Sequence, residues 1–177
     1  MKAILKSCRG VTMIELMTTV VIVGIVAAMA SPHFQKGIDR IKFRSQSKNV
    51  VSMLRTARSN AVSEKALYGV AFNFDEGTIV MFRDDANLGS NQFDAGADSV
   101  ISTDSLPRQE YGWSYSTFTN STVVFRPNGS ASSSGDVSLW YTSPSEYSES
   151  FINVLASTGR AKIVSMYHFE NSGTEYD

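Results

Sequence analysis

The chain has 177 residues, which is enough for one domain and an additional helix. Its net charge of −1 conceals an asymmetry: residues 34–65 hold eight Lys/Arg against two Asp/Glu, and residues 66–177 hold five against fourteen. Residues 66–177 have a net charge of −9, which argues against binding of nucleic acid by this part of the chain. The basic segment that precedes it predicts association with copies or relatives of the chain. The one cysteine, Cys8, excludes a disulfide within the chain.

The first thirty residues combine a basic start with an apolar run. Residues 1–10 carry three Lys/Arg, and residues 11–30 have Glu15 as their one ionisable side chain. Twenty helical residues span roughly 30 Å, the thickness of the hydrocarbon core of a bilayer. We therefore expect a leader over residues 1–10 and a transmembrane helix segment over residues 11–32. A carboxylate inside such a run is costly, so Glu15 is a candidate functional residue.

Three kinds of N-terminal segment fit this pattern. The small residues around Ala28-Met29-Ala30 are typical of the cleavage site of a secretory signal peptide. An uncleaved signal anchor has the same basic and apolar parts. In the third kind only the leader is removed, and the helical pattern that continues beyond Ala30 favours this alternative. Charge alone leaves the orientation open, because Lys and Arg flank both ends of the apolar run.

The third alternative rests on the string Gly-Val-Thr-Met-Ile-Glu-Leu at residues 10–16, which resembles the processing site of type IV prepilins and pseudopilins. Members of that family typically have Phe and Leu where this chain has Val11 and Met13, and both replacements are apolar. The resemblance implies that a prepilin peptidase cleaves after Gly10 and that Val11 is N-methylated. It also implies that Glu15 pairs with the amino group of a neighbouring subunit during assembly.

The same resemblance implies a location and a set of partners. Pro32 stands where family members often carry a helix-kinking proline. The implied protein crosses the bacterial inner membrane once, with a cytoplasmic N-terminus and a periplasmic head. Its implied partners are the prepilin peptidase, other pilins or pseudopilins in a filament, and the inner-membrane secretion machinery, and no cofactor is implied.

After Pro32 the sequence predicts a helix to about Lys65, which makes residues 33–66 an amphipathic segment that continues into the head. Its apolar positions form two stripes. The first stripe, expected to face neighbouring subunits or the membrane surface, consists of Phe34, Ile38 and Ile41. The second stripe, expected to pack on a sheet, consists of Phe43, Val50, Leu54, Ala57 and Ala61. The helix face opposite the second stripe carries Arg44, Lys48 and Arg55. This face is expected to be solvated or to meet acidic heads in a filament.

Residues 67–177 are predicted to form a head rich in antiparallel strands, because apolar and polar residues alternate and turn residues separate the alternating runs. The predicted strands are 68–74, 78–83, 100–101, 122–126, 137–142, 151–155 and 160–167. An α+β fold follows, with a long N-terminal helix whose first half spans the membrane and whose C-terminal half packs on an antiparallel sheet.

One acidic loop in the head offers oxygen ligands of the kind that calcium prefers. Its polar side chains are Asp84, Asp85, Asn87, Asp94 and Asp98. Their spacing differs from that of an EF-hand, so a solvated loop remains the alternative to a calcium site. His33 and His168 have no Cys or carboxylate at zinc-ligand spacing, and no nucleophile elbow or metal-hydrolase pattern is present, so the sequence does not predict an enzyme.

Three segments of the head, at residues 80–98, 125–129 and 157–160, resemble the H-type pseudopilin family (GspH/FimT). This resemblance implies a minor pseudopilin, a structural subunit of the type II secretion pseudopilus that helps export folded proteins. The alternative is a minor type IV pilin of the FimT kind, in pilus assembly or DNA uptake. Residues 159–162 resemble a basic motif of DNA-binding relatives, which makes Arg160 and Lys162 candidate DNA contacts. The acidic head argues against them, so DNA is not expected as a partner.

Overall fold

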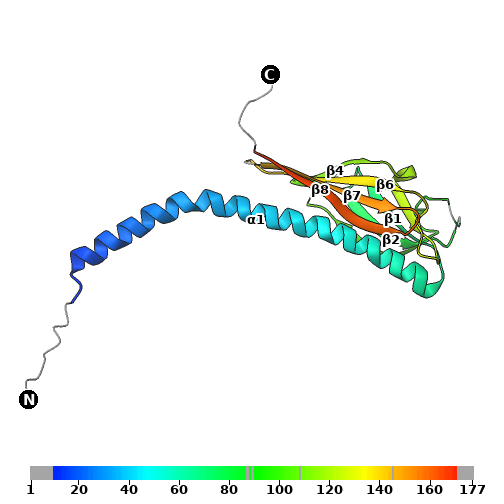
Figure 1. Cartoon of the computed structure of the whole chain (residues 1–177), viewed down its shortest axis with the longest axis horizontal. Coiled ribbons are helices and arrows are strands. Elements are labelled where there is room, and N and C mark those ends of the chain that lie inside the picture. The colour runs from blue at the N-terminus through cyan, green and yellow to red at the C-terminus, as the bar shows by residue number, and fades with distance from the viewer. Residues whose placement is uncertain (1–9, 87, 89, 108, 145, 171–177) are drawn as a thin grey trace, which may run out of the picture. The chain divides into compact units, whose positions relative to one another are not determined.

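The computed structural model describes residues 10–86, 88, 90–107, 109–144 and 146–170. One long helix is followed by strands and a short 3-10 helix (Figure 1). The elements are α1 (Met13–Glu64), β1 (Tyr68–Asn73), β2 (Thr78–Arg83), β3 (Ser99–Ser105), β4 (Tyr111–Ser116), η1 (Thr119–Ser121), β5 (Thr122–Phe125), β6 (Gly135–Thr142), β7 (Glu146–Leu155) and β8 (Arg160–Glu170). The predicted α+β fold is confirmed. Of the predicted leader, only Gly10 lies among the described residues.

The chain divides into two compact units, one that ends at Asp39 and one over Arg40–Asp177. The first unit contains the N-terminal part of α1, and the second contains the rest of α1 and all the described strands. The helix passes through Pro32. The kink expected at this proline stays a prediction.

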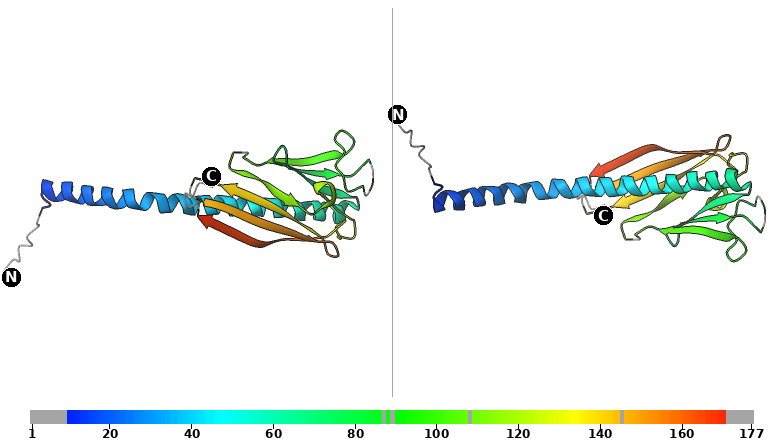
Figure 2. Two further views of the ribbon diagram at one scale, coloured as in Figure 1. Left: turned by 90° about the horizontal axis from the view of Figure 1, so that it is seen from above. Right: turned by 90° about the horizontal axis from the view of Figure 1, so that it is seen from below.

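The strands of the second unit form two four-stranded sheets, which the sequence did not predict as separate. The first sheet has the order β3-β2-β1-β5 and the second has the order β4-β6-β7-β8, and all neighbouring pairs are antiparallel. In Figure 2 the orange and red strands β7 and β8 lie on one side of the C-terminal half of α1, and the green strands of the first sheet lie on the other side. Strand β8 is therefore a sheet edge that runs beside the helix.

The second apolar stripe of α1 packs into the core of the head, as predicted. Phe43, Leu54 and Ala61 have no exposed surface and belong to one buried cluster with inward side chains of both sheets. These inward side chains include Val70, Phe72, Ile79, Met81 and Val123 of the first sheet and Trp113, Val137, Leu139, Ile152 and Val154 of the second. In contrast, Phe34 and Ile41 of the first stripe are 72% and 71% exposed, so these side chains are not part of the core.

Two strands differ from the prediction. Strand β4 is absent from the predicted strands, although Tyr111 and Trp113 alternate there with small residues, which is a usable signal. Strand β7 begins at Glu146, well before the predicted start at residue 151. The inward positions in this first half of β7 are Glu146, Ser148 and Ser150, all buried, so the usual alternation of apolar and polar residues is missing.

The helix packing predicts the effect of a truncation in the core. Leu54→Ala should lower the free energy of unfolding by about 3 kcal/mol, because it removes a fully buried side chain and leaves a cavity between the helix and the sheets. Denaturant unfolding of the detergent-solubilised chain, followed by tryptophan fluorescence, measures this change. The control Ile41→Ala, at an exposed position, should alter stability by less than about 0.5 kcal/mol. Equal losses from the two variants would contradict the assignment of the core.

Candidate assembly segment and head surfaces

Thr12 and Glu15 define the start of α1. The Thr12 hydroxyl accepts a hydrogen bond from the backbone N–H of Glu15 at 3.3 Å, and the Thr12 carbonyl accepts one from the N–H of Leu16 at 3.1 Å. This is the T-x-x-E spacing of a capping box, and a carboxylate in the first turn is favoured by the positive end of the helix dipole. Gly10 and Val11 precede the helix, and Val11 is 71% exposed. The motif residues thus form a capped helix start with a negative charge in its first turn.

The N-terminal part of α1 presents exposed apolar side chains along its described length. The segment Met13–Ala30 is long and apolar enough to cross a membrane, and none of it is buried. Its hydroxyl groups bond within the helix: Thr18 donates to the carbonyl of Ile14 at 2.6 Å, and Thr19 donates to that of Leu16 at 2.8 Å. Such internal pairing is what lipid requires, because hydrocarbon offers no alternative partner.

A buried carboxylate, Glu146, joins three elements of the head. Its side chain is 2% exposed, and Arg40 of α1 donates Nε–H to both of its oxygens, at 2.8 and 3.1 Å. Nδ1 of His168 in β8 lies 3.2 Å from Glu146 Oε1 and 2.7 Å from the hydroxyl of Ser148. Serine and carboxylate approach the same ring nitrogen, whereas a catalytic triad places them on opposite nitrogens. The arrangement therefore holds the helix to the second sheet and does not form a triad.

Basic side chains of α1 and of the edge strand β8 line two adjoining hollows of about 620 and 460 Å³, which we call the α1–β8 groove. The groove residues are Arg40, Ile41, Arg44, Lys48, Val51, Ser52 and Arg55 of α1 and Lys162, Ile163, Met166 and His168 of β8. Arg55 Nη2 donates to the carbonyl of Ala161 at 3.2 Å, which ties the helix to the strand at one end of the groove.

The groove brings together cations that the sequence analysis treated separately. Arg44, Lys48 and Arg55 are exposed, as predicted, but they border β8. Lys162, predicted as part of an isolated basic pair with Arg160, lines the groove beside Lys48 and Arg55. Arg160 is exposed and is not a groove residue. The sequence could not reveal this cluster, because its two halves are separated by more than a hundred positions.

Two carboxylates of the acidic loop, those of Asp85 and Asp98, make contacts within the chain. Asp98 accepts three backbone N–H groups, those of Asp85 at 3.1 Å, Ala86 at 3.3 Å and Asp94 at 2.8 Å. The carboxylate of Asp85 pairs with Arg83 at 3.0 Å. Asp84 is buried, and Asn87 lies outside the described residues. In the described part of the chain, no three His, Cys, Asp or Glu side chains are grouped so that they could hold a metal, and the calcium site stays a prediction.

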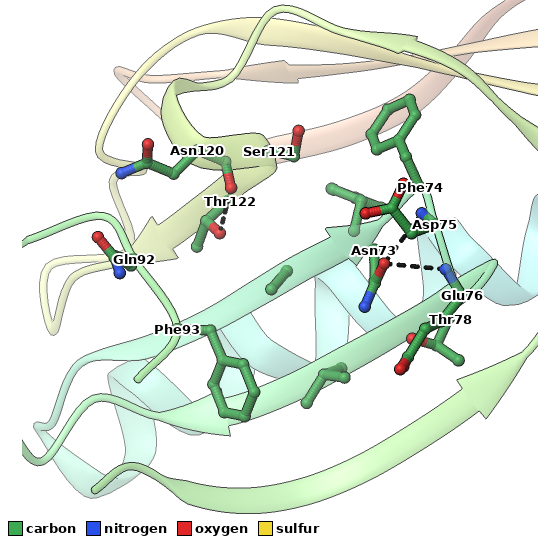
Figure 3. Close-up of a pocket in the computed structure, with 13 residues that line it drawn as sticks. Asn73, Phe74, Asp75, Glu76, Thr78, Gln92, Phe93, Asn120, Ser121 and Thr122 are labelled. Carbon is green, nitrogen blue, oxygen red and sulfur yellow. Dashed lines mark hydrogen bonds between the residues drawn. The ribbon is translucent and has the colours of Figure 1, made fainter. Parts of the chain in front are cut away.

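A hollow of about 540 Å³ lies on the face of the first sheet that points away from the core (Figure 3). Outward side chains such as Ala71 and Val80 form its floor, and Phe93 of the acidic loop borders it. The β1–β2 turn, residues 74–76, forms part of its rim. Asn73 Oδ1 accepts the N–H groups of Asp75 and Glu76, both at 3.0 Å, which fixes the conformation of this turn.

The outer face of the second sheet carries a row of aromatic rings that the sequence analysis did not identify. Ring centroids of Phe151 and Tyr167 are 5.8 Å apart, and Tyr115, Tyr147 and Phe169 extend the row at spacings of 6.0 to 6.2 Å. Burial raises the pKa of Tyr115 and of Tyr147, so these phenols are neutral at physiological pH. Period-two aromatics in β7 and β8 are the sequence signal that could have revealed the row.

Comparison with known proteins gives matches for both parts of the chain. Residues 5–31 match the family model of the prokaryotic N-terminal methylation motif, and residues 46–158 match that of the type II transport protein GspH. The type IV major pilin protein PilA of Myxococcus xanthus (strain DK1622) is 35% identical over 104 residues, which are 56% of this chain and 47% of that pilin. The chain therefore spans about half the length of this curated relative.

Two solved structures are similar to the chain. The type IV minor pilin FimU of Pseudomonas aeruginosa (strain PAO1) has a TM-score of 0.52 and 13% identity, over 72% of this chain and 91% of FimU. The minor pseudopilin EpsH from the type 2 secretion system of Vibrio cholerae has a TM-score of 0.49 and 11% identity, over 69% of this chain and 95% of EpsH. At such identity the FimU match shows a common fold.

The Glu146 cluster predicts a stability effect. Arg40→Ala should lower the free energy of unfolding by about 3 kcal/mol, because it leaves a buried carboxylate without its guanidinium partner. Arg44→Ala, a control on the same helix whose side chain makes no salt bridge within the described residues, should cost less than about 0.5 kcal/mol. Replacing both partners, as in Arg40→Met with Glu146→Leu, should recover most of the loss. Denaturant midpoints compare the four proteins, and an Arg40→Ala midpoint equal to that of Arg44→Ala would be inconsistent with this role.

Proposed function

The chain belongs to the family of the type II transport protein GspH, and we propose that it works as a minor pseudopilin, a structural subunit of the type II secretion pseudopilus that helps export folded proteins. The observation that carries this proposal is the combination of the two family matches, the methylation motif at residues 5–31 and the GspH model over residues 46–158. The family consists of structural pilin-like subunits. The exposed apolar helix and the motif together mark the chain as membrane-anchored.

In this proposal a prepilin peptidase cleaves after Gly10 and methylates Val11. Val11 is exposed and precedes the first helical turn, so the bond to be cleaved lies outside the hydrogen-bonded helix. Cleavage would create an amino group at Val11, close to the positive end of the helix dipole, where a cation is disfavoured. A carboxylate from a neighbouring subunit would stabilise that cation.

Glu15 is the residue that supplies such a carboxylate. A lone charge in an apolar filament core would be costly, whereas an amine and a carboxylate that pair can leave water together. The proposed orientation follows from the same processing step: the leader is cytoplasmic, α1 crosses the inner membrane once, and the head is periplasmic. The proposed neighbours are other pseudopilins or pilins and the inner-membrane secretion machinery.

A second candidate function is that of a minor type IV pilin of the FimT kind, in pilus assembly or DNA uptake. The observation that favours it is the position of Lys162, which lies beside Lys48 and Arg55 and not alone on an acidic surface. The net charge of −9 over residues 66–177 opposes phosphate binding by the rest of the head. We therefore keep the pseudopilin as the primary proposal.

Blocking the processing site should leave the precursor intact. Gly10→Leu should keep the leader attached, because a bulky side chain next to the cleaved bond obstructs the peptidase, and the protein should remain in the membrane fraction. Intact mass and N-terminal sequencing of the extracted protein measure this, with the wild type expected to begin at a methylated Val11. A wild-type chain that begins at Ser31 would instead identify a secretory signal peptide.

Loss of the carboxylate at Glu15 should prevent assembly without affecting the head. Glu15→Leu should enter the membrane and keep its thermal unfolding midpoint, because residue 15 lies outside the unit Arg40–Asp177. Its recovery with the other pseudopilus subunits should fall by at least about tenfold, since the pairing of buried charges is lost. Thr19→Val, which removes a polar group from the same helix but no charge, is the matched control. Normal recovery of Glu15→Leu would refute the charge-pairing account.

A further inference from the structure

Three exposed cations in the α1–β8 groove have no anionic partner among the residues that the structure describes. Arg44, Lys48 and Lys162 make no salt bridge among the described residues, whereas Arg40 and His168 of the same groove both contact Glu146. Between the cations lie apolar side chains, those of Ile41, Ile163 and Met166 among them. A hollow lined by apolar side chains and by cations without a salt bridge among the described residues fits a segment that carries both acidic and apolar side chains.

The backbone of β8 contributes to the same surface. This strand is the outer member of the second sheet, so one of its edges has no partner among the described strands. Arg55 covers that edge at the carbonyl of Ala161 and closes one end of the groove. Beyond this contact the groove continues between Lys48 and Ile163 towards Met166. The two hollows therefore form one continuous surface that an incoming segment can occupy.

A complementary surface exists on the other side of the head. Residues 66–106, which include strands β1 to β3, hold seven Asp/Glu against one Arg. The β1–β2 turn presents Phe74, Asp75 and Glu76, all exposed, and Asn73 fixes its backbone (Figure 3). An apolar ring next to two carboxylates is the combination that the groove fits. A turn that is already rigid loses little conformational entropy on binding.

We propose that the β1–β2 turn of one subunit docks into the α1–β8 groove of a second copy of this chain. Phe74 enters among the apolar side chains of the groove, and the carboxylates of Asp75 and Glu76 meet Lys48 and its basic neighbours. The contact is heterologous, because it joins two different patches, and such contacts propagate into open helical assemblies when they do not close into rings. The inference rests on the proposed function and specifies how heads meet within the filament.

Charge reversal on each side tests the contact in the full-length chain. Two tagged forms are mixed in detergent at low salt, and recovery of one form with the other is measured. Lys48→Glu or Asp75→Lys, introduced in both forms, should weaken association by at least about tenfold, because like charges then face each other. Mixing Lys48→Glu copies with Asp75→Lys copies should restore association, since the unaltered groove of the Asp75→Lys copy meets the unaltered turn of the Lys48→Glu copy, and the altered groove and turn are again opposite in charge.

Lys42→Glu is the matched control, because Lys42 is exposed on the same helix but is not a groove residue, and it should associate like the wild type. The docking contact would be overturned if Lys48→Glu, Asp75→Lys and Lys42→Glu weakened association equally. It would also be overturned if mixing Lys48→Glu copies with Asp75→Lys copies did not restore association. A third result would also overturn it: copies of the chain fail to associate, but the chain binds duplex DNA and Lys48→Glu abolishes that binding. This result would favour the second candidate function.

Failure of this contact is distinguishable from failure of the proposed function. If both groove and turn variants associate normally while Glu15→Leu is lost from the pseudopilus, the docking contact is wrong and the pseudopilin proposal stands. If the wild-type chain joins neither a second copy nor any other pseudopilin, both are wrong.

Discussion

The packing of Phe43, Leu54 and Ala61 against the inward side chains of both sheets sets the orientation of α1 on the head. Because these residues occupy one side of α1, the basic residues on its flank are held beside β8. The same packing brings Arg40 to the buried Glu146, which a helix rotated by a quarter turn could not reach. The groove is therefore a consequence of helix orientation, and the truncation of Leu54 should weaken it together with the core.

Sequence periodicity accounts for the helix stripes and for most strands, since apolar residues recur there at the spacing of the element that they form. It fails in the first half of β7, where the inward positions are Glu146, Ser148 and Ser150. Burial of Glu146 and Ser148 depends on partners from α1 and β8 that no local pattern specifies, whereas the buried hydroxyl of Ser150 has no hydrogen-bond partner among the described residues. The assembly motif at residues 10–16 could be identified from the sequence because its chemistry is local.

The head surfaces were less predictable, because charge counts along the chain do not describe the distribution of charge in space. Residues 66–177 are acidic as a whole, yet Lys162 lies in a basic environment that α1 creates. The acidic loop shows the converse, since Asp98 is occupied by backbone N–H groups and Asp85 by Arg83. Tertiary contacts thus engage the carboxylates of Asp85 and Asp98 within the chain and gather lysines and arginines from α1 and β8 on one surface.

Among the described residues, the hydrogen bonds that begin α1 lie on the C-terminal side of the bond between Gly10 and Val11. Thr12 supplies both the hydroxyl and the carbonyl that receive the first helical N–H groups, so the proposed removal of the leader takes away none of them. Precursor and mature chain can therefore share one helix start, and the apolar segment need not shift its depth in the bilayer when it is processed. Maturation would then change the charge at the end of the helix while its length stays constant, so an inserted precursor would be ready for assembly as soon as its leader is gone.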